Sequence, residues 1–211
     1  MSAAASTKCI PRVLIVFGAM MTAMALADCR SVPPVREGQL FSASGVQFRV
    51  PAGTDWFKYQ DNAEGIYLER FGPGSGEVLS VGMHFGSMPT MSSPDAFLEF
   101  ARESLVGHLP WKSRHLDFQL RTNRRYPCVL LHVTGDVYRH ESIFGIFGTA
   151  HLRHANAFSL LCENPAAPNE TFAAVYHHIG DTLPQGFEEN AAAFIDSVRP
   201  VAPDPAPPQR P

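Results

Sequence analysis

Short apolar segments separated by a few residues set the strongest constraint on how this chain of 211 residues folds. In residues 44–51, Val46, Phe48 and Val50 alternate with polar side chains and Pro51 ends the run, as in a half-buried β-strand. Further strands are predicted at residues 66–71, 77–83, 116–120, 126–137 and 148–162. Because short turns join them, these strands predict an antiparallel meander.

Two helices are predicted beside this sheet. The first covers about residues 94–106, since Ser93 can cap it, Pro94 suits its first position and Gly107 can end it. A terminal helix is indicated by an apolar stripe at helical spacing, formed by Phe187, Ala191, Phe194, Ile195 and Val198. Residues 171–179 fit either period, and we favour a strand there. The predicted fold class is α+β: an antiparallel β-sheet meander flanked by two helices.

The first 27 residues are typical of an export signal. Lys8 and Arg12 give a positive start, residues 13–27 are apolar, and residues 25–27 offer the small side chains that a signal peptidase accepts. At about 1.5 Å per residue, this apolar run is too short to span about 30 Å of hydrocarbon. We therefore predict a signal peptide over residues 1–27 and a protein that crosses the inner membrane into the periplasm.

The rest of the chain divides by composition into three parts. Residues 28–43 are predicted to be a flexible lead, residues 44–199 a single α+β domain, and residues 200–211 a disordered tail rich in proline. Removal of residues 1–27 takes away two basic residues and no acidic one, so the net charge falls from −3 to −5. This balance, without a clustered basic surface, argues against a nucleic acid as partner.

Cys29 leaves the processing of the N-terminus open. Residues 26–29 resemble the box of bacterial lipoproteins, in which the cysteine becomes a lipidated first residue. Asp28, however, places a charge where that box has a small neutral residue. Ordinary cleavage after Ala27, lipidation of Cys29 and an uncleaved anchor are the three possibilities. We expect contact with the membrane only through lipidation at Cys29.

Cys128 and Cys162 lie within predicted strands and are the candidates for a disulfide. An exported protein meets an oxidising compartment, where such a bridge forms and persists. The alternative is a pair of buried free thiols, because the sequence alone does not show that the two Cα atoms come within bridging distance.

Nine histidines raise the question of a metal site or a catalytic centre. His151 and His154 point to opposite faces if their segment is a strand, so a metal site would need cross-strand pairs such as His132 with His151. Cys162 with His132 or His154 would be the strongest nucleophile pair, but a disulfide removes the thiolate. We assign no catalytic, cofactor-binding or metal-binding residue, and expect no cofactor.

Residues 143–148 combine large apolar side chains with two glycines. Phe144 and Phe147 are candidates for a loop that binds a partner or touches a membrane. A bent strand that enters the core is the simpler interpretation, because isolated apolar runs of this length are usually buried.

An opening strand at residues 46–53 with Trp56 close behind is followed by a hairpin ending at residues 78–82, a helix at residues 93–98 and a closing segment at residues 194–198. This order resembles the PsbP-like fold superfamily, which includes the DcrB-type bacterial envelope lipoproteins. The resemblance implies an α/β/α sandwich and a non-catalytic role in binding or assembly. The superfamily shares no single active site, so the resemblance assigns no functional residue.

We expect an exported, non-catalytic accessory or binding protein of the cell envelope, with an unknown envelope protein or a small ligand as its partner. Two alternatives stay open: a small hydrolase or metal-dependent enzyme that uses the histidine-rich meander, and a carrier of a small ligand. The enzyme would need His132 or His151 for turnover, whereas the carrier would hold a small molecule when freshly isolated.

Cleavage after Ala27 predicts an exported protein that carries no lipid. Cells grown with radiolabelled palmitate should therefore leave the protein unlabelled. Label that enters the protein and is lost in Cys29→Ala would show lipidation at Cys29 instead. Such acyl chains would then anchor the protein in the membrane.

Overall fold

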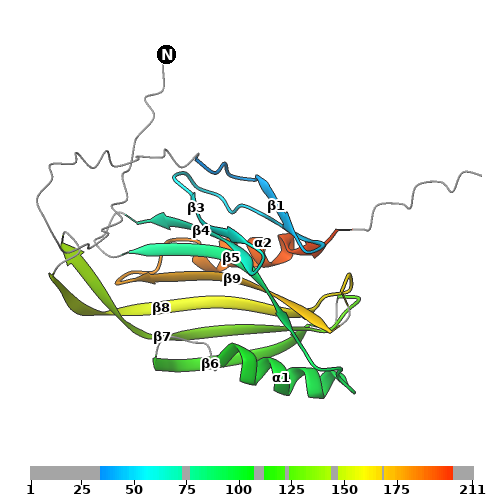
Figure 1. Cartoon of the computed structure of the whole chain (residues 1–211). Coiled ribbons are helices and arrows are strands. Elements are labelled where there is room, and N and C mark those ends of the chain that lie inside the picture. Colours follow the sequence, from blue (N-terminus) through cyan, green and yellow to red (C-terminus); the bar gives the residue numbers. More distant parts are fainter. Residues whose placement is uncertain are drawn as a thin grey trace, which may run out of the picture.

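The computed structural model describes residues 34–72, 77–106, 112–121, 124–143, 147–167 and 169–201. This part of the chain folds into antiparallel sheets with two helices, so the predicted α+β class is confirmed. Figure 1 shows a large twisted sheet with the helices beside it. The predicted signal peptide, Cys29 and the tail after Val201 lie outside the described residues.

The large sheet has seven strands in the order β3-β4-β5-β9-β8-β7-β6, and each described pairing is antiparallel. The strands are β3 (Phe57–Asn62), β4 (Gly65–Phe71), β5 (Val78–Ser87), β6 (Lys112–Arg121), β7 (Cys128–Ile143), β8 (Phe147–Glu163) and β9 (Glu170–Gly180). Two meanders, β3-β4-β5 and β6-β7-β8-β9, join where β5 pairs with β9. Residues 171–179, whose pattern fits a helix or a strand, lie in the strand β9, as the sequence analysis favours.

A second, small sheet joins β1 (Leu40–Ala43), β2 (Val46–Arg49) and β10 (Arg199–Pro200) in the order β1-β2-β10. Its first strand falls within the lead that the sequence predicts to be flexible, so that prediction is wrong at residues 40–43. Packing is the reason: the Phe41 ring stacks on Phe48 with centroids 5.6 Å apart, and Phe48 in turn contacts Phe194.

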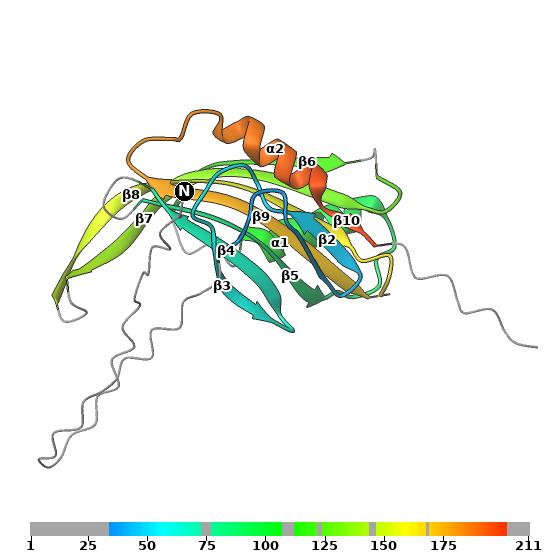
Figure 2. The same cartoon turned by 90° about the horizontal axis from the view of Figure 1, so that it is seen from above.

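Alternation along the strands gives the large sheet two packed faces. The α2 face, which includes Leu130, Leu160 and Tyr176, packs against α2 (Phe187–Ser197) and the small sheet in the main core. The α1 face, which includes Val129 and Leu161, packs against α1 (Pro94–Val106). Figure 2 shows α2 lying along one side of the sheet, above β9.

Both helices lie where the sequence predicts them. The hydroxyl of Ser93 caps α1 by accepting a hydrogen bond from the Ala96 N–H at 3.2 Å, and Pro94 is the first helical residue. Gly186 precedes α2 with a left-handed φ of 71°, which glycine adopts without strain. Neither helix within the described residues has the length and apolar character needed to cross a membrane.

Cys128 and Cys162 form the predicted disulfide, so the alternative of two free thiols is wrong. They are direct cross-strand partners in β7 and β8, with their Cα atoms 4.1 Å apart, and both side chains are buried in the main core. The bridge also removes Cys162 as a candidate nucleophile, because a disulfide sulfur is not a thiolate.

Cys128→Ala combined with Cys162→Ala should lower the free energy of unfolding by about 3 to 4 kcal/mol. Without the bridge, the unfolded chain regains the entropy of an open loop between residues 34 positions apart. Urea unfolding followed by circular dichroism measures the difference. A double variant as stable as the bridged protein would contradict this role of the disulfide.

Candidate functional site

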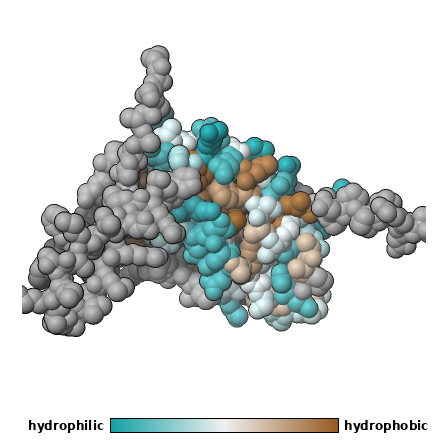
Figure 3. Space-filling view, turned by 45° about the horizontal axis from the view of Figure 1, so that its top comes forward, coloured by the Kyte–Doolittle hydropathy of each residue, from teal (hydrophilic) through white to brown (hydrophobic). Residues whose placement is uncertain are grey.

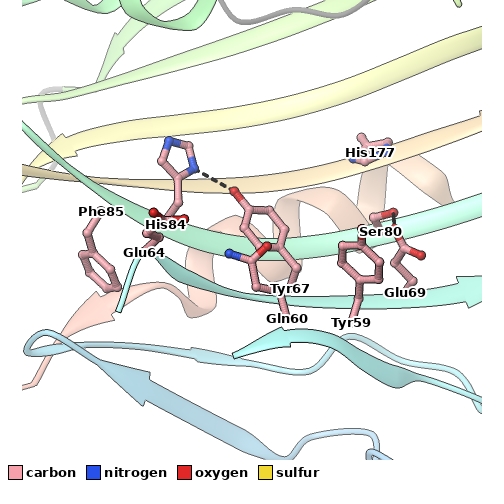
Figure 4. A pocket seen from close by; sticks show the side chains of 9 residues that line it. All are labelled: Tyr59, Gln60, Glu64, Tyr67, Glu69, Ser80, His84, Phe85 and His177. Atoms are coloured by element: carbon pink, nitrogen blue, oxygen red, sulfur yellow. Dashed lines mark hydrogen bonds between the residues drawn. The ribbon is translucent and has the colours of Figure 1, made fainter. Parts of the chain in front are cut away.

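One pocket lies on the α1 face, over β3, β4, β5 and β9 (Figure 4). We call it the tyrosine–histidine pocket; it measures about 630 Å³ and is lined mainly by Tyr59, Tyr67, Glu69, Ser80, His84 and His177. The register explains how three of these residues meet. Glu69, Ser80 and His177 are successive cross-strand partners in β4, β5 and β9, so their side chains project from one face.

Gly82 allows the ring of Tyr67 to lie across β5. The two residues are cross-strand partners, and a Cβ at Gly82 would come within 2.3 Å of that ring. The ring therefore reaches His84, with Tyr67 Oη and His84 Nδ1 3.0 Å apart and the ring centroids separated by 6.4 Å. Burial raises the pKa of Tyr67, so its hydroxyl stays neutral near neutral pH.

Two pairs of polar side chains in the tyrosine–histidine pocket bond to each other. Besides the contact of Tyr67 with His84, Ser80 Oγ donates to Glu69 Oε1 at 3.4 Å, and Figure 4 shows both pairs. Ser80 is thus bonded to a carboxylate, whereas a serine hydrolase bonds its nucleophile to a general base such as histidine. This arrangement suits a binding surface better than nucleophilic chemistry.

A polar row crosses the α2 face at the margin of the main core. Successive cross-strand partners over β7, β8, β9, β5 and β4 form this row: Thr134, Asn156, His178, Leu79 and Arg70. The adjacent row, which contains Phe158 and Tyr176, belongs to the main core or packs against it. The polar row therefore marks where apolar packing under α2 gives way to polar groups.

His178 is buried at the centre of this row, with 2% of its surface exposed. Its Nε2–H donates to Glu77 Oε1 at 3.1 Å. Burial lowers the pKa of His178 by more than the bonded Glu77 carboxylate raises it, so the imidazole is neutral near neutral pH. Gly180 gives the ring its room, because a Cβ there would lie 2.7 Å from His178 Cε1.

Two smaller pockets share His178 as part of their lining. The first measures about 230 Å³ and lies over Thr134 and Asn156. The second, which we call the arginine pocket, measures about 260 Å³ and is lined by Asp55, Arg70, Phe71, Glu77, Leu79, His178 and Pro184, among others. The guanidinium of Arg70 lies over the Trp56 ring, 5.2 Å from its centroid, and forms no hydrogen bond or ion pair with the described residues.

The histidines singled out in the sequence do not meet as a metal site would need. The cross-strand partner of His132 is Phe158, whose ring stacks on it with centroids 4.3 Å apart, and the partner of His151 is Arg139. The pair of His132 with His151 therefore does not form, and His132 Nε2 donates to Asn156 Oδ1 at 3.1 Å. In the described ranges, no three His, Cys, Asp or Glu side chains converge as metal ligands do.

The strands β7 and β8 continue together past the rest of the sheet (Figure 2). Pairing of β6 with β7 ends at Asp136, and pairing of β9 with β8 ends at His154. Residues 137–143 and 147–153 therefore pair with each other, and no third described strand pairs with them. We call this two-stranded extension the arm.

Two large apolar side chains are neighbours on the arm. Tyr138 and Leu152 are cross-strand partners with 71% and 51% of their surfaces exposed. On the face drawn in Figure 3, hydrophobic residues are scattered among hydrophilic ones, as on an ordinary protein surface. An adjacent exposed pair on an element without a core of its own is different, because it is available to a partner.

The predicted partner loop is described only in part. Phe147 begins β8 opposite Ile143, whereas Phe144 lies outside the described residues. A partner loop and a bent strand therefore both remain predictions for residues 143–148.

Charged pairs surround the base of the arm. His154 Nδ1 lies 3.0 Å from Asp136 Oδ1, which joins β8 to β7 where the arm begins. Arg153 forms an ion pair with Asp181, just after β9, and its hydrogen bond lowers the pKa of that carboxyl. Both pairs lie where the arm joins the sheet.

The buried His178 should make stability depend on pH. The unfolded chain binds a proton near the ordinary pKa of 6.5, whereas the folded protein resists protonation of this ring. Stability is therefore full above pH 6.5 and falls as the pH drops from there toward the lower pKa of the folded state. Urea unfolding at a series of pH values should show that the free energy of unfolding falls below pH 6.5, and falls less in His178→Gln. An equal dependence on pH in both proteins would refute this role of His178.

Comparison of the sequence with protein families and with curated proteins found no match in either. The function of the sites therefore has to follow from their own chemistry. In the tyrosine–histidine pocket two polar pairs are bonded across the strands, in the arginine pocket a guanidinium faces a cavity, and on the arm Tyr138 and Leu152 face solvent. These three arrangements are suited to binding.

Proposed function

We propose that this is an exported, non-catalytic accessory protein of the bacterial cell envelope, which binds an extended segment of another envelope protein through the arm. The observation that carries the proposal is the pairing of the arm strands. They continue past both neighbouring strands, and no third described strand lies beside them.

The arm has the backbone geometry that a partner strand needs. A two-stranded ribbon without a packed face is marginally stable in water, and its edges present backbone N–H and C=O groups to any approaching chain. An extended segment of a partner would satisfy these groups by adding a strand, as in other complexes formed by β-augmentation. Binding would thereby stabilise the element that performs it.

The side chains of the arm supply an apolar anchor for such a partner. Tyr138 and Leu152 face the same side of the ribbon, because they are direct partners in the register. Aromatic residues dominate the binding energy of many interfaces when they become buried. Phe147, a candidate from the sequence, begins the arm strand of β8, whereas the other candidate, Phe144, lies outside the described residues.

The sequence supports the proposed location of the protein, and the arrangement of its layers supports the proposed fold. The apolar run at residues 13–27 supports export. Helices packed on both faces of one antiparallel sheet support a PsbP-like α/β/α sandwich of the kind found in DcrB-type envelope lipoproteins. Members of that superfamily act in binding and assembly without a shared catalytic centre.

The two alternatives differ in their support. A hydrolase or metal-dependent enzyme has less structural support than a carrier, because His132 stacks on Phe158 and Cys162 is in a disulfide. A carrier of a small ligand keeps one specific observation in its favour, which is the guanidinium of Arg70 facing a pocket without a described acceptor.

A photo-crosslinking phenylalanine derivative in place of Tyr138 should form an adduct with one envelope protein in intact cells. Leu40 is the control, because it is an exposed apolar residue, at 48%, on β1 of the small sheet, away from the arm. The adduct should be absent with the derivative at position 40, and Leu152→Ser should lower its yield about tenfold by removing part of the anchor.

Several results would count against binding through the arm. Among them are equal adducts from positions 138 and 40, an adduct whose yield does not respond to Leu152→Ser, and an adduct with a second copy of this chain. Circular dichroism and an intact Cys128–Cys162 bridge in each variant show that the body remains folded. Absence of any adduct at position 138 would also refute the proposal.

A further inference from the structure

We propose that the arginine pocket binds an apolar amino acid, with its carboxylate on Arg70, its ammonium group near Asp55 and Glu77, and its side chain against the apolar wall. The pocket of about 260 Å³ lies between the loop before β3, the adjoining ends of β4 and β5, and the segment before α2. It belongs to the body of the protein, so the inference is independent of the arm.

The guanidinium of Arg70 is held in place on two sides. Its Cζ lies over the Trp56 ring, and Nη1 occupies space beside Gly53, 2.0 Å from where a Cβ would be. The φ of Gly53, +124°, is a further reason for glycine at this position. A planar guanidinium fixed in this way is prepared for a bidentate bond to a carboxylate.

The described residues do not supply that bond. Arg70 is partly buried, yet it forms no hydrogen bond or ion pair with the residues that the structure describes. Arginine side chains in such positions are ordinarily paired, because a charge removed from water without a partner destabilises the fold. A ligand carboxylate would provide the missing acceptor.

Two acidic residues argue against a simple anion as the ligand. Asp55 and Glu77 line the same pocket, and His178 is bonded to Glu77. One cation therefore faces two anions. A carboxylate or phosphate alone would be attracted by Arg70 and repelled by both acids, whereas a zwitterion matches both signs.

The remaining wall selects an apolar side chain. Leu79, Phe71 and Pro184 line the pocket beside the charged groups. The pocket is also smaller than sites that hold drug-sized ligands, which measure about 300 to 1,000 Å³. A single aliphatic amino acid carries its ammonium and carboxylate groups on the same α-carbon. It fits these features better than a peptide does.

Isothermal titration calorimetry of the purified exported protein with three probes tests the proposal. L-leucine carries both charges, 4-methylpentanoate lacks the ammonium group and 3-methylbutylamine lacks the carboxylate, while the aliphatic chain is shared. L-leucine should bind about tenfold or more tightly than either single-charge probe. Equal binding of the amine or of the carboxylate, or no heat from L-leucine at about 10 mM, would overturn the inference.

Two variants assign the charges to residues. Arg70→Gln should weaken L-leucine binding about tenfold or more, whereas Arg102→Gln, on α1, should leave it unchanged. Asp55→Asn should weaken L-leucine but strengthen 4-methylpentanoate, because the repulsion is removed. Asparagine tolerates the left-handed φ of 64° at this position, so the variant keeps the fold. An Asp55→Asn protein that binds both probes like the parent would refute the assignment, as would an unchanged affinity in Arg70→Gln.

Discussion

The cross-strand register of β7, β8 and β9 is the constraint on which the rest of the structure depends. Because successive residues of a strand point to opposite faces, this register sends Leu160 to the core under α2 and Leu161 to the core under α1. A slip of one residue would exchange the two sets and turn polar side chains toward a helix. The Cys128–Cys162 bridge joins two direct partners, so it fits this register alone.

The same register brings together polar groups that are far apart in the sequence. Glu77 and His178 are 101 positions apart and meet because β5 lies beside β9. Arg70 enters the same region from β4, one strand further along. Burying these groups costs free energy unless they are bonded, which is why a guanidinium that bonds no described residue is informative beside a bonded imidazole. Sheet pairing, and not local sequence, decides what these residues can recognise.

Much of the fold could be predicted, because it depends on local signals. Ser93 and Pro94 mark the start of α1, and the alternation in residues 66–71 and 77–83 marks the paired strands β4 and β5. The strand β3 was missed, since its sequence at Phe57–Asn62 is mostly polar, as suits an exposed edge strand. The short β1 was missed for another reason: it is held by an aromatic contact with a later strand.

The candidate sites were harder to predict than the fold. The large number of histidines drew attention to His132 and His151. The register, however, pairs His132 with Phe158 and His151 with Arg139, so the two histidines do not meet. A glycine within an apolar strand is a better signal, because it marks a close approach of another group. Gly82 beside Tyr67 is such a case. The signal gives the place of a contact, but the partner becomes known only from the pairing of strands.

The position of the disulfide has a consequence for how the hairpin comes apart. The bridge closes one end of the β7–β8 ladder, and the arm is its other end. A ladder clamped at one end frays from the other, and each broken pair costs little where no third strand adds bonds. Local opening can therefore separate the two strands of the arm without reaching the core, which leaves the body folded.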